Sequence, residues 1–130
     1  MPSYSNPSTI CINYGLWDFG DGGETMSFKL PKGMSGRLRD VIVQATEAFN
    51  AVTTEGEVNI GSADGGKQYA NCGMGALADK ASYRLSDNSA DLVLATLPAD
   101  TNICVAFVAP TGGTAAGKGF VTIVIDCFVA

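Results

Sequence analysis

Two stretches near the end of the sequence decide the fold: Asn102-Ile-Cys-Val-Ala-Phe-Val-Ala109 and Gly119-Phe-Val-Thr-Ile-Val-Ile-Asp-Cys-Phe-Val-Ala130. Both are dense in β-branched and aromatic residues, which favour strands. In the second stretch every odd position from 121 to 129 is apolar, whereas the even positions are mixed. The first stretch is apolar on both faces, so it needs a cover on each side. That cover is either another layer of the same chain or a neighbouring subunit around a symmetry axis.

The loop between the two stretches imitates a phosphate-binding loop. Gly112 to Lys118 matches the first seven positions of the pattern G-x-x-x-x-G-K-[ST], but Gly119 occupies the position of the hydroxyl that binds Mg²⁺. A working loop of this kind also opens a helix whose amides face the phosphates, and here a strand-like run follows. We therefore expect a hairpin turn at 110–118 and no nucleotide site.

Composition limits the classes of function. The 130 residues are enough for one domain with a core of its own. Charged residues make up only 16% of the sequence, against about 25% in typical soluble domains, which suggests that other protein covers much of the surface. A net charge of −5 without a basic run argues against nucleic-acid or anionic-membrane partners. No apolar run approaches the roughly 20 residues of a membrane-spanning helix.

The cysteines and the lack of histidine exclude several kinds of catalytic site. The sequence has no His, so Ser–His and Cys–His units and His-ligated metals are excluded. Its four cysteines form no C-x-x-C pair, and two of them lie inside the apolar stretches, where a thiol behaves as a small hydrophobe. The polar first residues lack the basic region of a signal peptide. We therefore expect reduced thiols and folding in a cytoplasm.

Short strands separated by turn signals indicate an all-β sandwich. Residues 1–8, with Pro2 and Pro7, read as an extended N-terminal arm, and 9–130 as a single sandwich domain. The segment 37–50 fits a helical stripe as well as a strand; we choose the strand because Val41-Ile-Val43 is β-branched. Residues 69–78 are weakly determined, with a short helical turn possible. The other strands are expected at 9–14, 25–30, 57–60, 82–85 and 92–95.

Acidic residues of the sequence offer candidate metal-binding and catalytic groups. Trp17-Asp-Phe-Gly-Asp-Gly22 matches a signature of polycystic-kidney-disease-type immunoglobulin-like domains, but it lies too near the start of the chain and the later motifs of those domains are missing. Asp18, Asp21 and Glu24 have oxygen ligands suited to Ca²⁺, although acids in solvated turns are commoner. A hydrolase needs two converging carboxylates, and nothing in the sequence brings two together among Asp40, Glu47, Glu55, Glu57, Asp64 and Asp126.

The sequence therefore predicts no catalytic, cofactor-binding or metal-binding residue, and no enzymatic activity. Its only local basic cluster comprises Lys32, Arg37 and Arg39. We interpret this cluster as a solvated strand start or as a contact to an acidic partner.

Several short segments occur in an order typical of one protein group. They are Tyr14-Gly-Leu-Trp-Asp-Phe-Gly20, Pro31-Lys-Gly-Met-Ser-Gly-Arg-Leu-Arg-Asp40, Ala45-Thr-Glu-Ala-Phe-Asn50, Val52-Thr-Thr54, Val58-Asn-Ile-Gly61, Leu97-Pro-Ala-Asp-Thr101 and Ala109-Pro-Thr-Gly-Gly-Thr-Ala-Ala-Gly117. In this order they resemble small virion structural proteins of tailed bacteriophages, of the head decoration (cement) type. The sequence departs from the pattern at Trp17 and Asp21 in the first glycine loop, and at Ala115, where Pro is usual.

The resemblance implies a jelly-roll-like β-sandwich that binds the outside of the assembled phage head and stabilises it. It implies a homotrimer with the major capsid protein as its other partner, no cofactor, and a place on the virion exterior after synthesis in the host cytoplasm. Such proteins act by linkage, because they bind the mature lattice and not the dissociated subunits. Residues 1–8 would suit an arm that adds to the edge of a neighbour's sheet.

Two other functions remain open at this point. A phage fibre or tail module that binds host glycans would expose aromatic side chains such as Trp17 or Tyr69. A glycosidase or other hydrolase would show a cleft with converging carboxylates.

Overall fold

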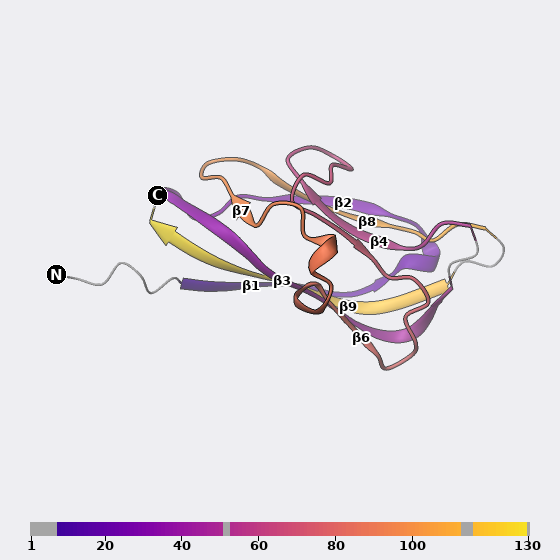
Figure 1. Ribbon diagram of the computed structural model, residues 1–130. Coiled ribbons are helices and arrows are strands. Elements are labelled where there is room, and N and C mark those ends of the chain that lie inside the picture. The colour runs from indigo at the N-terminus through magenta and orange to yellow at the C-terminus, as the bar shows by residue number, and fades with distance from the viewer. Residues whose placement is uncertain (1–7, 51–52, 113–115, 130) are drawn as a thin grey trace.

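The chain forms two antiparallel sheets that face each other (Figure 1). The computed structural model describes residues 8–50, 53–112 and 116–129. Sheet A contains, in spatial order, β1 (Ser8–Asp18), β9 (Ala116–Val129), β3 (Met34–Asn50) and β6 (Ser82–Arg84), and β7 (Thr96–Leu97) also pairs with β3. Sheet B contains β2 (Glu24–Phe28), β8 (Ile103–Val108), β4 (Glu57–Gly61) and β5 (Ala70–Gly73). The predicted all-β sandwich is confirmed.

Only short 3-10 turns interrupt the strands in the described residues. They are η1 (Phe19–Asp21), η2 (Leu85–Asp87) and η3 (Ser89–Asp91). Within the described ranges no helix is long and apolar enough to cross a membrane. Residues 1–7 of the predicted arm lie outside the described residues, and Ser8 is the first residue of β1.

The core lies between the sheets, on the faces that the alternation predicts. On β9, the side chains at 121, 123, 125 and 127 are at most 1% exposed. They share one apolar cluster with residues of sheet B, among them Val58, Ile60, Val105 and Phe107. Burial of each such side chain contributes about 1.5–3 kcal/mol. The last described strand is therefore a main contributor to the core.

The ambiguous segment 37–50 is a strand, as predicted, and the structure explains its helical pattern. β3 runs from Met34 to Asn50, and its register against β9 shifts between Leu38 and Asp40 and again between Ala45 and Glu47. A bulge adds one residue to the strand and so breaks the simple alternation of faces. Leu38 and Val41 are both buried although they lie three positions apart. Their helix-like spacing thus comes from a bulge.

Two local predictions are wrong, and one weakly determined segment contains a strand. The stretches joined by 110–118 do not form a hairpin, because β8 pairs with β2 and β4 in one sheet whereas β9 pairs with β1 and β3 in the other. The strand expected at 92–95 gives way to η3 and the later β7, and 69–78 contains strand β5 in place of a helical turn. Sequential strands pair in only about two-thirds of cases, and local propensity does not reveal the exceptions.

The two-sided apolar character of β8 is explained within the chain. Its inward residues are buried, and Ala106 on the other face is only 4% exposed. β8 lies between β2 and β4, and the Thr25 hydroxyl on β2 donates a hydrogen bond of 2.6 Å to Asp64 in the β4–β5 connection. This connection therefore crosses the outer face of sheet B over β8 (Figure 1). Another layer of the same chain supplies the second cover.

Candidate functional site

In the described part of the glycine loop, the groups that would hold a phosphate contact carboxylates instead. Lys118 lies on strand β9 and its ammonium group lies 3.8 Å from Asp18 and 3.9 Å from Glu47. The Gly117 N–H donates to Glu47 Oε1 at 3.3 Å. Lys118 and the Gly117 amide, the groups that would face a phosphate, therefore contact carboxylates. Residues 113–115 lie outside the described residues.

The structure separates most of the candidate carboxylates. Asp40 accepts from Ser86, and Asp64 accepts from Thr25. Asp126 accepts from the Thr9 hydroxyl at 2.9 Å and lies 3.5 Å from Arg39. These partners come from neighbouring strands or loops, so the three carboxylates have structural roles at separate places.

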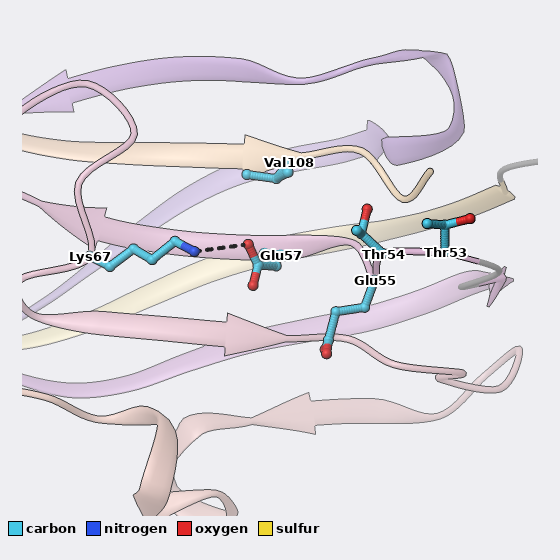
Figure 2. Close-up of a pocket in the computed structure, with 6 residues that line it drawn as sticks. All are labelled: Thr53, Thr54, Glu55, Glu57, Lys67 and Val108. Atoms are coloured by element: carbon cyan, nitrogen blue, oxygen red, sulfur yellow. Dashed lines mark ion pairs between the residues drawn. The ribbon is translucent and has the colours of Figure 1, made fainter. Parts of the chain in front are cut away.

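Glu55 and Glu57 line the same open pocket on the outer side of sheet B (Figure 2). The pocket has a volume of about 480 Å³ and is lined by Thr53, Thr54, Glu55, Glu57, Lys67 and Val108. Lys67 Nζ lies 3.6 Å from Glu57 Oε1, which also accepts from Asn59 Nδ2 at 3.2 Å. Glu55 Oε1 accepts from the Gly75 amide at 3.2 Å.

The contacts of Glu57 argue against a hydrolytic pair with Glu55. A glycosidase needs one carboxyl group that donates a proton and a second that acts as base or nucleophile. The Glu57 carboxylate is engaged by a cation and an amide side chain, whereas Glu55 has no ion pair among the described residues. Within the described ranges no group of three Asp, Glu, Cys or His residues could hold a metal ion. Asp18, Asp21 and Glu24 therefore do not converge as a calcium site.

The tryptophan signature belongs to the core and to a turn. Asp18 Oδ1 accepts from the Gly20 amide at 3.0 Å and caps η1. Phe19 is fully buried, and the Trp17 ring lies 5.6 Å from that of Phe107. Tyr69, the other aromatic considered for glycans, is only 6% exposed. Neither Trp17 nor Tyr69 is presented on a loop as a stacking platform, so the fibre-module alternative loses the feature that would support it.

The predicted basic cluster is not one patch with one role. Lys32 lies in the turn between β2 and β3, whereas Arg37 and Arg39 lie on β3. Arg39 pairs with Asp126 on the neighbouring strand β9. Ion pairing within the sheet therefore accounts for Arg39.

Cysteine chemistry is confined to the interior and to one exposed position. The four cysteines are free; Cys72 and Cys127 are buried, Cys104 is half-buried and Cys11 is exposed. Burial raises the pKa of the Cys72 thiol to about 12, and it also raises the pKa of Tyr83, whose hydroxyl donates to Asp91 at 2.7 Å. A thiol held neutral is not a nucleophile. Cys72 is therefore part of the core.

The outer face of sheet A presents the second, partly apolar side of the last apolar stretch of the sequence. We use this name for the outward side chains of β1, β9 and β3. Leu16 is 52% exposed and Phe120 is 47% exposed, and the two are register partners on β1 and β9. Cys11 is opposite Val124, and Ile42 is opposite Thr122. Phe128, at the far end of β9, is half-buried. The mixed even positions of the last stretch were the signal for this face.

Comparisons with known proteins show a likeness of fold. No family model and no curated protein matches the chain. A solved structure does match. A chain of the "Cyanophage Pam1 capsid asymmetric unit" superposes with a TM-score of 0.54 at 16% identity, over 97% of this chain and 90% of that one. At this identity the match shows a shared fold, and it extends over nearly the whole chain.

Proposed function

We propose that this chain is a non-enzymatic capsid decoration (cement) protein of a tailed phage. It binds the outside of the assembled head as a homotrimer and has a jelly-roll-like sandwich. The observation that carries the proposal is the fold shared, over 97% of the chain, with a chain of a phage capsid asymmetric unit. The ordered segments of the sequence that resemble cement proteins point the same way.

Features of the described residues agree with a structural role. The candidate carboxylates are dispersed or engaged in ion pairs and hydrogen bonds, so they offer no acid–base pair. The low charge and the uncovered apolar side chains on sheet A suit a protein that works against other protein surfaces. In this proposal the arm that adds to a neighbour's sheet comprises residues 1–7, because Ser8 already belongs to β1.

Stabilisation follows from linkage. A protein that binds the mature lattice and not the dissociated capsid protein shifts the equilibrium toward the lattice. At a free concentration one hundred times the dissociation constant, each occupied site contributes about 2.7 kcal/mol. Because one head carries many such sites, the free energies that they contribute add up to a large stabilisation of the lattice.

The test uses heads that lack the protein. Purified chain is added to mature heads, to immature heads and to dissociated capsid protein, and binding is measured by co-sedimentation. We expect binding to mature heads and a higher temperature of genome release, with little binding to the two controls. Absence of the chain from purified virions, together with no binding to mature heads, would overturn the proposal.

A further inference from the structure

We propose that the outer face of sheet A is the surface that copies of this chain bury against one another. This inference rests on one part of the proposed function, the homo-oligomer. It assigns the surface through which the copies contact one another. Sheet B covers the opposite side of sheet A (Figure 1). Leu16 and Phe120 stand exposed as neighbours on β1 and β9. The pair lies toward one end of the face, near the end of β1 and the start of β9. Apolar side chains that are exposed next to each other in this way mark an interaction surface.

Charge favours an identical partner on this face. The strands of sheet A carry as many cations as carboxylates: Arg37, Arg39, Arg84 and Lys118 against Asp18, Asp40, Glu47 and Asp126. Each of these carboxylates lies within 3.9 Å of a cation of the same sheet. The whole sequence has a net charge of −5, so the excess acid lies outside these strands.

Identical copies repel wherever both present net negative charge, because like charges in close contact are destabilising. A sheet whose ions are already paired within one copy avoids that repulsion. The outward side of sheet B is different: its pocket carries Glu55 and Glu57 against the single cation Lys67. Self-association is therefore favoured through sheet A over sheet B.

The size of the face is sufficient for association. From Lys118 to Phe128 the strand advances about 33 Å, at about 3.3 Å per residue. Three strands spaced about 4.8 Å apart give a face of about 500 Å². A contact that covers the whole face on two copies would bury about 1,000 Å² in total, the lower limit for a specific interface. In a trimer each copy would divide this face between its two neighbours. The area alone predicts a reversible assembly whose apolar contacts decide its strength.

The experiment compares two leucines of equal exposure. Leu16 on sheet A and Leu94 in the connection between η3 and β7 are each 52% exposed. Leu16→Glu and Leu94→Glu add the same charge to the same kind of side chain, and Phe120→Glu repeats the change on β9. Native mass spectrometry and light scattering across a dilution series measure the dissociation constant. Circular dichroism and a melting curve show that each variant is folded.

We expect an oligomer for the unmodified chain and for Leu94→Glu. For Leu16→Glu and Phe120→Glu we expect a dissociation constant about a hundredfold higher or more, because each copy would bury an unpaired carboxylate. An unmodified chain that is monomeric at every concentration overturns the inference. So does an oligomer that neither sheet A variant weakens. Failure of the unmodified oligomer to bind mature heads overturns the decoration function instead, so the two failures are distinguishable.

Discussion

Replacing Asp40 with Asn removes a buried carboxylate that ties η2 to β3. Asp40 is 8% exposed, and its two oxygens accept from the amide and the hydroxyl of Ser86, each at 3.1 Å. Arg84 lies 3.7 Å away with a side chain that is 51% exposed. A hydrogen bond to a charged group contributes about 1.5–3 kcal/mol, whereas an exposed ion pair contributes at most about 1 kcal/mol.

The amide keeps the shape of Asp40: its oxygen can still accept from the Ser86 amide, and its NH2 can donate to the Ser86 hydroxyl. The change therefore removes the charge and makes both hydrogen bonds neutral, which weakens each by about 1 kcal/mol. We expect Asp40→Asn to lower the free energy of unfolding by about 2 kcal/mol. For 130 residues the entropy of unfolding is about 0.27 kcal/mol per degree, so the melting temperature should fall by about 7 °C. Urea denaturation at a fixed protein concentration measures the change, with an unchanged slope as the sign that only stability differs.

Asp87→Asn is the matched control, because Asp87 lies in the same turn and is exposed. We expect its effect to stay within about 0.5 kcal/mol. A double-mutant cycle of Asp40→Asn with Ser86→Ala isolates the coupling of the pair. Equal stabilities of Asp40→Asn and the unmodified chain would refute the reasoning, and so would strictly additive effects in the cycle.

Three further predictions concern the core, a glycine and the exposed thiol. Burial raises the pKa of Cys72 from 9.0 to about 12, so the thiol loses its proton in the unfolded chain first, and the free energy of unfolding should fall as the pH rises above 9. In urea titrations at pH 10.5, Cys72→Ala should remove about 2 kcal/mol of that loss. Equal pH profiles for the variant and the unmodified chain would contradict this. A Cβ at Gly117 would lie 2.6 Å from a ring carbon of Phe49, whereas one at Gly33 would meet nothing within 4 Å. Melting curves should therefore show a loss of about 2–4 kcal/mol for Gly117→Ala against about 1 kcal/mol for Gly33→Ala, and similar losses would count against the packing argument. A maleimide reagent should label Cys11 before the other thiols, and more slowly in the assembled protein than after dilution to the monomer; mass spectrometry of the labelled peptides decides this.

Much of the sandwich could be predicted from the sequence because alternation of apolar residues reports which side of a strand is buried. The odd positions of β9 and the strand at 37–50 are examples. The assignment of β8 and β9 to different sheets could not be predicted, because pairing partners lie far apart in the chain. β1 pairs with β9 in a register that joins Ser8 to Cys127, for example. No local pattern encodes such a pairing.

The pocket on sheet B was missed for the same reason. Its lining comes from three segments: 53–57, Lys67 in the β4–β5 connection, and Val108 at the end of β8. The sequence carries one signal for this pocket: Glu57 alternates with the apolar Val58, which indicates that Glu57 points outward from the strand. The uncovered face of sheet A was easier to anticipate, since Phe120 and Val124 occupy the mixed side of the last apolar stretch.

The central place of β9 in sheet A sets the order of events during synthesis. β9 follows every other described strand in the sequence, yet it lies between β1 and β3 and pairs with both. While the ribosome is still making residues 116–129, β1 and β3 therefore lack the strand that joins them. Folding must wait for translation, and the long-range pairing makes it slow, in the range of about milliseconds to seconds. Prematurely terminated chains would expose unpaired strand edges and aggregate, so they would not enter an assembly as folded subunits.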